Sequence, residues 1–147
     1  MITIRQITKE DLNDLCQLYE ELIDKKTNYE KLVEVFETIN SNDNYYILGA
    51  FKDSELVGSL MGIICQDIVG DCRPFMVIEN VVVSNHIRRQ GIGQKLMAKI
   101  EGIARERNCY YIIFVSGGQR KEAHAFYEKL GFKDEKVEGF RKHLDEG

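Results

Sequence analysis

The stretch VIENVVVSNHIRRQGIGQKLM, residues 77–97, joins an almost unbroken apolar run to a turn with two glycines and then to a helical pattern. The apolar run is typical of a buried strand, and the spacing after Gly91 is typical of a helix that packs one face against it. Two features do not suit an ordinary strand and helix. Glu79 puts a carboxylate into the strand, and Gly91 and Gly93 stand where the helix should begin. Each feature therefore needs its own explanation.

The composition is that of one soluble globular protein. The chain has 147 residues, of which 44% are hydrophobic and 30% are charged, which is enough for a sizeable core. Its net charge of −4 argues against nucleic acid as the main partner. No apolar run approaches the roughly 18 residues of a membrane span, so we expect no membrane partner and a cytoplasmic location.

The cysteines of the chain are Cys16, Cys65, Cys72 and Cys109, and they form neither a CxxC pair nor a zinc spacing. In a cytoplasmic protein such cysteines are usually reduced thiols that pack in the interior. We therefore expect neither a disulfide nor a metal site.

Apolar periodicity predicts strands and helices over the whole chain. Thr8 and Asp11 resemble a capping box at the start of the first helix, and Gly131 suits the position after the last helix. Two of the strands flank the short segment KDS, which is typical of a hairpin. The expected strands are residues 2–7, 45–51, 55–65, 75–83, 109–116 and 139–144, and the expected helices are residues 8–22, 29–39, 91–107 and 119–132.

This order places antiparallel hairpins first and a strand–helix–strand crossover after them. A crossover of this kind joins parallel strands and is right-handed. We expect an α/β fold whose central sheet is mixed but mostly antiparallel, with about six or seven strands and about four helices on its two faces. Residues 1–147 would then form a single domain.

The glycine turn favours the binding of a phosphate or pyrophosphate. A helix N-terminus offers unpaired N–H groups and the positive end of the helix dipole. Gly91 and Gly93 lack Cβ atoms, so an anion can approach the backbone closely. Arg88 and Arg89 add positive charge at the same place. The alternative is a surface turn in which the glycines serve only the geometry.

Two common nucleotide-binding motifs do not fit this turn. A P-loop needs GxxxxGK[ST], which the sequence lacks. A dinucleotide fingerprint would need a third glycine where the chain has Leu96, and an acidic residue near position 111, where it has Tyr111. Both interpretations therefore fail.

The pattern that fits is Arg88-x-x-Gly91-x-Gly93 directly after a buried strand. It resembles the pyrophosphate loop Q/R-x-x-G-x-G/A of the GNAT N-acetyltransferase superfamily. A second motif, AHAFYEKLGF at residues 123–132, follows about 30 residues later, with one helix and one strand between the two. The resemblance covers essentially the whole chain, and it implies the GNAT fold with acetyl-coenzyme A as cosubstrate.

The resemblance also implies which residues hold the coenzyme. The pyrophosphate would lie on backbone N–H groups of the glycine turn, and the pantetheine arm would pair with the preceding strand as an added strand would. Many family members have an asparagine seven residues before the tyrosine of the second motif. This chain has Arg120 there, which leaves that contact open. The expected coenzyme-binding residues are Val81, Val82, Val83, Arg88, Arg89, Gln90, Gly91, Ile92, Gly93, Gln94 and Arg120.

Glu79 is the candidate general base. It is predicted to point to the same side of its strand as Val77, Val81 and Val83, where a lone carboxylate is costly unless it is paired or exposed. In the GNAT enzymes that the chain resembles, a glutamate at this position acts as the base, often through a water. Amines arrive mostly as ammonium ions at neutral pH, and only the free base can attack a thioester. The alternative is a strand glutamate that pairs with an arginine or reaches solvent.

Tyr127 is the candidate general acid. The resemblance places its hydroxyl near the sulfur of the coenzyme, where a phenol can protonate the departing thiolate. Alternatively, Tyr127 is a core aromatic, because Ala123, Phe126 and Leu130 share its helical spacing.

The second motif also resembles that of small GNAT enzymes that acetylate free amines, including the aminoalkylphosphonate acetyltransferases. We therefore expect an N-acetyltransferase that moves an acetyl group from acetyl-coenzyme A to a primary amine of a small molecule. Glu20, Glu21 and Asp24 would suit a cationic acceptor. Lys25, Lys26 and Arg73 would suit an anionic acceptor instead.

Other functions stay open at this point. One is an acetyltransferase of peptide or protein amines, and another is a catalytically silent acetyl-coenzyme A-binding module with a regulatory role. The presence of both Glu79 and Tyr127 favours the enzyme, because a sensor needs only the glycine turn and the pantetheine strand. A homodimer also stays open, since dimers are common in the family.

Overall fold

The computed structural model describes residues 1–87, 89–115, 125, 127–132, 135 and 137–145. Contacts within the chain divide it into two compact units, Met1–Phe114 and Val115–Gly147. The first unit contains the sheet and the long helices, and the second contains the second motif. A single domain over residues 1–147 remains a prediction.

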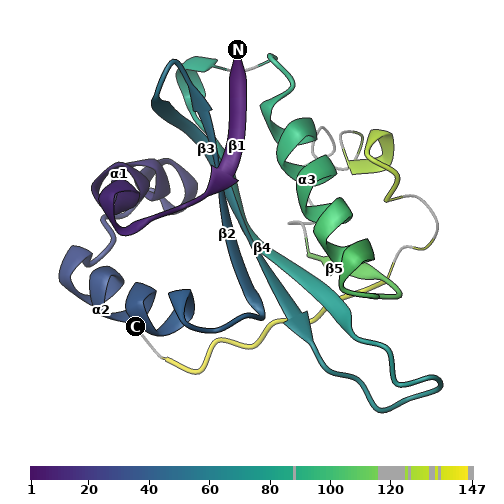
Figure 1. Ribbon diagram of the computed structural model, residues 1–147. Coiled ribbons are helices and arrows are strands. Elements are labelled where there is room, and N and C mark those ends of the chain that lie inside the picture. Colours follow the sequence, from purple (N-terminus) through teal and green to yellow (C-terminus); the bar gives the residue numbers. More distant parts are fainter. Residues whose placement is uncertain (88, 116–124, 126, 133–134, 136, 146–147) are drawn as a thin grey trace. The chain divides into compact units, whose positions relative to one another are not determined.

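The first unit is built on a five-stranded sheet with the strand order β1-β2-β3-β4-β5 (Figure 1). Neighbouring strands from β1 to β4 are antiparallel, and β5 joins β4 in parallel. This arrangement confirms the α/β fold with a mixed, mostly antiparallel sheet. The strands are β1 (Ile2–Gln6), β2 (Tyr45–Lys52), β3 (Glu55–Cys65), β4 (Phe75–Val83) and β5 (Ile112–Phe114).

In the described residues the sheet has fewer strands than the six or seven predicted. Residues 139–144, expected to form a last strand, have no regular secondary structure. Phe140 and Leu144 in this segment are 93% and 88% exposed, so neither side chain gains the burial that stabilises a strand. The strand predicted at residues 109–116 is also shorter, because its pairing with β4 covers only Ile112–Phe114.

Helices lie on both faces of the sheet, as predicted (Figure 1). α1 and α2 lie on one face, whereas α3 lies on the other and forms the crossover from β4 to β5. Leu96 and Ile100 of α3 are fully buried against the glycines of β3. The helices are α1 (Leu12–Ile23), α2 (Tyr29–Asn40) and α3 (Ile92–Glu106), with short 3-10 turns at Lys9–Asp11 and Asn85–Ile87.

The core under α1 and α2 is a continuous apolar cluster that includes Leu15, Phe36 and Val82. α1 and α2 have 12 residues each, a length that is marginal for an isolated helix in water, so packing on this cluster stabilises them. Among the helices that the structure describes, none combines the length and the apolarity needed to cross a membrane.

The predicted capping box fixes the start of α1. The backbone N–H and the hydroxyl of Thr8 both donate to Asp11 Oδ2, at 2.8 and 3.1 Å. The Arg5 guanidinium donates to both oxygens of this carboxylate, at 2.7 and 3.0 Å, and it lies 3.9 Å from the centre of the Phe51 ring. The hydrogen bond from Arg5 lowers the pKa of Asp11 against the opposing effect of burial, and the Thr8 contacts lower it further. One carboxylate therefore joins β1 to the start of α1.

Gly131 ends the helix of the second motif, as predicted, after helical residues 127–129. It has φ +97°, and its N–H donates to Glu128 O at 3.1 Å, while the Phe132 N–H donates to Tyr127 O at 3.0 Å. This pair of bonds is a Schellman motif. The rings of Tyr127 and Phe132 pack edge to face across it, with their centroids 6.5 Å apart.

Candidate active site

β4 contains a β-bulge beside Glu79. Ser59 of β3 pairs with Val82, but Met61 pairs with Glu79, so β4 has one residue more than β3 between these two pairs. Asn80 lies in this interval in the left-handed conformation, with φ +57°. Asparagine tolerates that conformation better than most residues, and bulges often lie next to active sites, where they redirect a side chain.

The bulge changes which β4 residues face each side of the sheet. Before the bulge, Met76 faces α3 and lies close to Ile100. After the bulge, Val82 belongs to the apolar cluster under α1 and α2. Even-numbered residues of β4 therefore face α3 before Asn80 and the opposite side after it.

Glu79 lies on the α1 and α2 side of the sheet, because its partner Met61 packs against the cluster there. Val77 shares this side, as predicted. Val81 and Val83 instead lie on the α3 side, since Val83 pairs with a glycine that faces α3, so this part of the prediction is wrong. An unbroken apolar run shows no alternation, so the sequence could not reveal the change of side.

The side chain of Glu79 is exposed, and no described residue forms a hydrogen bond or an ion pair with it. Within the described residues, the alternative of a strand glutamate paired with an arginine is therefore not observed. The carboxylate is available to a ligand that binds on the α1 and α2 side of the sheet.

Beyond the bulge, no described strand of the first unit lies beside the outer edge of β4. The pairing of β4 with β5 begins at Met76–Ile112 and ends at Ile78–Phe114. Over residues 79–83, β5 therefore uses none of the amide and carbonyl groups on this edge, whereas the other edge is paired with β3. An open edge of this kind can accept an extended ligand by strand addition.

The N-terminus of α3 follows shortly after this open edge. Gly91 is the N-cap residue, with φ +73°, a conformation that glycine adopts without the usual penalty of a Cβ atom. Among the described residues, no side chain caps the first N–H groups of α3. Uncapped N–H groups at the positive end of a helix are the arrangement that binds phosphates.

Contacts from two other elements hold the segment between β4 and α3. Glu21 at the end of α1 accepts hydrogen bonds from the Asn85 N–H at 2.6 Å and from the Ser84 hydroxyl at 3.3 Å. The Ser84 hydroxyl also lies 2.8 Å from His86 Nδ1, and His86 Nε2 lies 3.3 Å from Glu55 Oε1. The sequence suggests Glu21 only as an acceptor contact and assigns no role to His86. In the structure, both side chains hold this segment through hydrogen bonds.

The remaining coenzyme-binding predictions fall partly outside the described chain. Arg89 is exposed, with φ +67°. Lys52 of β2 donates to Gln90 Oε1 at 2.8 Å, which puts a cation beside the turn. Local sequence patterns could not predict this contact, because the two residues are 38 positions apart. Arg88 and Arg120 lie outside the described residues.

The two predicted catalytic residues belong to different units. Glu79 lies in the first unit, together with the open edge of β4 and the glycine turn. Tyr127 lies in the second unit, where it is half-buried and packs against Phe132. The structure therefore describes the surroundings of each residue within its own unit.

The basic residues suggested for an anionic acceptor lie on the surface of the first unit. Arg73 donates to the carbonyl oxygens of Asn108 and Cys109, each at 3.2 Å, so its guanidinium supports the backbone. Lys25 and Lys26 are exposed in the turn after α1.

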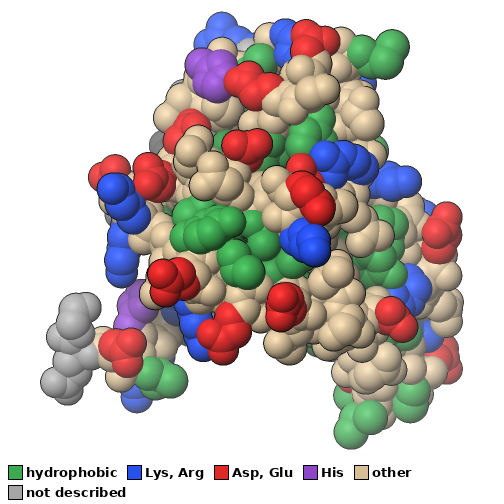
Figure 2. All heavy atoms as spheres, turned by 60° about the vertical axis from the view of Figure 1, so that its left-hand side comes forward, with side chains coloured by type: hydrophobic (Ala, Val, Ile, Leu, Met, Phe, Trp, Pro, Cys, Tyr) green, Lys and Arg blue, Asp and Glu red, His purple; other side chains and the backbone are tan. Residues whose placement is uncertain are grey.

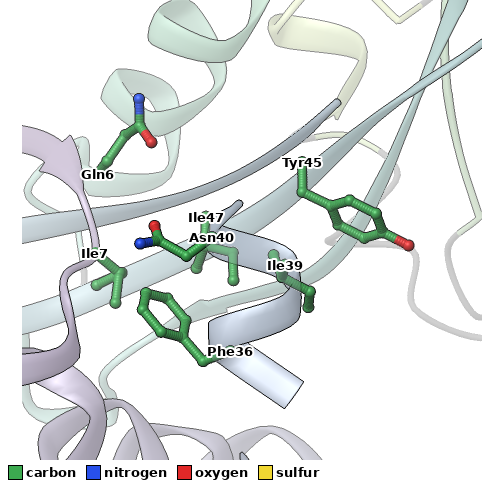
Figure 3. Close-up of a pocket in the computed structure, with 7 residues that line it drawn as sticks. All are labelled: Gln6, Ile7, Phe36, Ile39, Asn40, Tyr45 and Ile47. Carbon is green, nitrogen blue, oxygen red and sulfur yellow. The ribbon is translucent and has the colours of Figure 1, made fainter. Parts of the chain in front are cut away.

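A small pocket lies between β1, β2 and α2 (Figure 3). Ile7, Phe36 and Ile39 form its apolar walls, and Gln6 and Asn40 contribute amide groups. Its lining includes none of the predicted site residues, so it is separate from the candidate active site.

The sequence matches one known protein family. Residues 11–132 match the family described as "Acetyltransferase (GNAT) family". The match runs from the capping box before α1 to the residue after Gly131, so it includes both motifs.

Individual proteins show the same likeness. The chain is 26% identical over 130 residues to the aminoalkylphosphonate N-acetyltransferase of Salmonella typhimurium, with 88% of this chain and 84% of that protein covered. It is 28% identical over 138 residues to glucosamine 6-phosphate N-acetyltransferase 1 of Dictyostelium discoideum, with 87% and 84% covered. A solved structure of a putative acetyltransferase from Agrobacterium tumefaciens has a TM-score of 0.89 at 26% identity, with 97% of this chain and 99% of that chain covered. The chain belongs to the acetyltransferase (GNAT) family, and it is an acetyl-coenzyme A-dependent acyltransferase.

Proposed function

We propose that the protein transfers the acetyl group of acetyl-coenzyme A to a primary amine of a small molecule, with Glu79 as general base and Tyr127 as general acid. The observation that carries this proposal is the combination found along β4. An exposed carboxylate, an open strand edge and a helix N-terminus without a side-chain cap follow one another within 16 residues of chain, from Glu79 to Gln94.

The described residues fit coenzyme A. The uncapped N–H groups from Gly91 to Gln94 suit the diphosphate, and the open edge at residues 81–83 suits the two amides of the pantetheine arm. Arg88 and Arg120 complete the proposed set, and Lys52 adds a positive charge beside the turn. When bound, acetyl-coenzyme A supplies the acetyl group as a reactive thioester.

Glu79 and Tyr127 would move the two protons of the reaction. The amine nitrogen forms a bond to the acetyl carbon as the carbon–sulfur bond breaks. Glu79 would take the proton that the ammonium group must lose before it attacks, and the phenol of Tyr127 would give its proton to the departing sulfur. The second proton, which the nitrogen loses as it becomes an amide, would restore the phenol of Tyr127. The exposure of Glu79 supports its role, because an incoming amine can reach a carboxylate that no described side chain occupies.

The relatives support a small acceptor. The names of the proteins from Salmonella typhimurium and Dictyostelium discoideum specify aminoalkylphosphonates and glucosamine 6-phosphate, which are both small molecules with an amino group. We propose acceptors of this size in preference to peptides.

The proposal is tested by thiol release from acetyl-coenzyme A. The full-length protein is incubated with a panel of primary amines that includes polyamines, aminoglycosides, amino acids, aminoalkylphosphonates and a lysine peptide. We expect thiol release with at least one small amine and formation of its N-acetyl derivative by mass spectrometry. Tight binding of acetyl-coenzyme A in calorimetry without transfer to any amine would identify a silent regulatory module, and transfer to the peptide alone would identify a protein acetyltransferase.

We also propose that the protein works in the cytoplasm. All four cysteines are free thiols, and Cys72 is exposed, which suits a reducing compartment. Fractionation of cells that express the full chain, followed by immunoblotting, tests the location.

A further inference from the structure

The face of the sheet that carries Glu79 is open over the neighbouring parts of β3 and β4. Ile63 pairs with Val77 and Cys65 pairs with Phe75, on the same face as the Met61–Glu79 pair. All four of these side chains are only half-buried. The apolar surface therefore begins next to the proposed base and continues away from it.

The openness is specific to this face. On the opposite face of the same strand segments, Ile64, Met76 and Ile78 are 4%, 0% and 2% exposed, because α3 covers them. A sheet that was merely frayed at this end would expose both faces. The half-exposed residues thus form a surface that the described helices leave uncovered.

β5 extends this surface. Ile113 pairs with Val77 and is half-buried. Tyr111 is 40% exposed, and its ring stacks on Phe75 with the centroids 5.2 Å apart. The Tyr110 ring meets the Tyr111 ring edge-on at 4.5 Å, so aromatic rings pack together at this end of the surface. We name this surface the apolar patch and define it as Ile63, Phe75, Val77, Tyr111 and Ile113.

The apolar patch has an acidic group at one end. Glu79 lies on the same face two residues after Val77, a distance of roughly 7 Å along a strand. The patch itself contains no lysine or arginine, and the Arg73 guanidinium just before β4 is a cation at the other end that donates to backbone carbonyls. Figure 2 shows the side of the molecule that carries α1 and α2, where acidic and basic side chains both lie around exposed hydrophobic ones. At the end that carries Glu79, this surface suits an ammonium group attached to an apolar body.

We propose that the acceptor is an amphipathic primary amine, whose ammonium group meets Glu79 and whose aliphatic or aromatic body lies on the apolar patch. This inference rests on the proposed function, since it assigns the acceptor of the same site. Charge complementarity selects the occupant, because the patch ends at an exposed carboxylate without a described partner. In this respect the chain would differ from the two relatives named for phosphonate and phosphate acceptors.

Primary amines of increasing apolar size test the inference. The series is ethanolamine, butylamine, hexylamine and 2-phenylethylamine, with 2-aminoethylphosphonate as the anionic comparison. We expect kcat/KM to rise about twofold for each added methylene group. This corresponds to roughly half of the free energy that complete burial of a methylene gives, because the patch is open on one side. The rise should come from KM, since the apolar body binds away from the reacting atoms.

A matched pair of variants locates the effect. Val77→Thr replaces a methyl group of the patch by a hydroxyl, and Val69→Thr makes the same change in the loop between β3 and β4, where Val69 is 71% exposed. We expect Val77→Thr to raise KM for 2-phenylethylamine about fivefold. This effect is smaller than the roughly tenfold discrimination that a closed hydrophobic pocket gives for one methylene group, because the patch is open on one side. KM for ethanolamine should not change, and Val69→Thr should behave as the wild type. Calorimetric binding of 2-phenylethylamine to the coenzyme A complex gives the same comparison without turnover.

The outcomes separate this inference from the proposed function. Transfer to ethanolamine or 2-aminoethylphosphonate with no gain along the apolar series would overturn the inference and leave the acetyltransferase intact. No transfer to any amine, together with no binding of 2-phenylethylamine, would overturn both. A wild-type dimer in light scattering that Val77→Glu converts to a monomer would show that a second copy occupies the patch, and it would also overturn the inference.

Discussion

The carboxylate of Glu21 accepts the Asn85 N–H at 2.6 Å, so the last turn of α1 is joined to the segment that leads from β4 to the N-terminus of α3. The same carboxylate accepts the Ser84 hydroxyl at 3.3 Å. Ser84 is in turn held by its N–H, which donates to Val57 O at 2.8 Å. α1 therefore helps to set the position of the proposed diphosphate cradle.

We expect Glu21→Ala to weaken the binding of acetyl-coenzyme A without slowing the chemical step. Loss of these hydrogen bonds, worth roughly 1 kcal/mol at an exposed site, should raise KM for acetyl-coenzyme A about fivefold. The measurement is steady-state kinetics with the acetyl-coenzyme A concentration varied. Glu20→Ala is the matched control, because Glu20 is the preceding residue of the same helix and its side chain has no described partner. Equal KM values for the two variants would show that the bridge does not position the cradle.

The left-handed conformation of Gly91 predicts different effects of the same substitution at two glycines. Gly91→Ala should lower the free energy of unfolding by about 1–2 kcal/mol, because an L-residue at φ +73° is strained. At Gly102, in the exposed part of α3, an added Cβ atom meets no atom within 4 Å. Gly102→Ala should therefore raise the free energy of unfolding by about 0.5–1 kcal/mol, because alanine favours the helix more than glycine does. Urea denaturation measures both. Stabilisation by Gly91→Ala would mean that the turn adopts another conformation in solution.

The bridge from Arg5 to Asp11 predicts a pH-dependent contribution to stability. The pKa of Asp11 is lower in the folded protein than its ordinary value of 3.8. Its charge therefore stabilises the fold above that ordinary pKa, and the contribution is lost as the pH falls through the lowered folded pKa. Asp11→Asn should lower the free energy of unfolding by about 1–2 kcal/mol at pH 7. The effect is smaller than for a fully buried ion pair, because Arg5 is partly exposed.

The difference between the wild type and Asp11→Asn should shrink as the pH falls below about 4, where the unfolded carboxyl becomes protonated. Urea denaturation from pH 3 to pH 7 gives this comparison. Asp71→Asn serves as the control, since Asp71 is exposed in the loop between β3 and β4 and should leave stability unchanged at each pH. A difference that stays constant with pH would assign the effect of Asp11→Asn to packing alone.

The parts of the site that depend on backbone conformation close in sequence could be predicted. Gly131 has positive φ, as expected for a glycine directly after a helix. Gly91 also has positive φ, although the sequence suggested only that its missing Cβ atom lets an anion approach the backbone. Asn80 also has positive φ, but a single asparagine in an apolar strand does not distinguish a bulge from a regular strand. The orientation of Val81 and Val83 was wrong for this reason.

The parts that depend on distant side chains could not be predicted. Glu21 and Asn85 are 64 positions apart, and Lys52 and Gln90 are 38 apart, so no local pattern relates them. At residues 139–144 the sequence predicted an element that the structure does not contain. The sequence predicted a last strand there, but a strand needs a partner that buries its apolar residues, and Phe140 and Leu144 are exposed.

Tyr127→Phe tests the proposed general acid. The change removes the hydroxyl but keeps the ring that packs edge to face on Phe132, so the end of the helix should be preserved. We expect kcat to fall about a hundredfold, at the lower end of general acid catalysis, while the affinity for coenzyme A stays the same. Steady-state kinetics and calorimetry measure the two quantities. Tyr29→Phe, an exposed tyrosine of α2, is the control, and an unchanged kcat in Tyr127→Phe would remove the phenol from the mechanism.

Glu79→Gln tests the proposed general base through the pH dependence of the reaction. Without a carboxylate to take the proton, the variant can use only the small fraction of amine that is already deprotonated. Its kcat/KM should therefore rise about tenfold for each pH unit up to the pKa of the amine, near 10.4 for an alkylamine. The wild-type enzyme should have a flatter profile near neutral pH, because its base accepts the proton from the bound ammonium ion.

The shape of the profile separates this role from a structural one, because loss of packing would lower kcat/KM by the same factor at every pH. At pH 7 the variant should be about a hundredfold slower than the wild type, and the difference should narrow as the pH rises. Glu106→Gln, at the end of α3 and exposed, controls for the loss of one negative charge. Parallel profiles for the wild type and Glu79→Gln would show that Glu79 is not the general base. Glu79 would then be an ordinary exposed strand residue beside the bulge at Asn80, with a carboxylate that moves no proton.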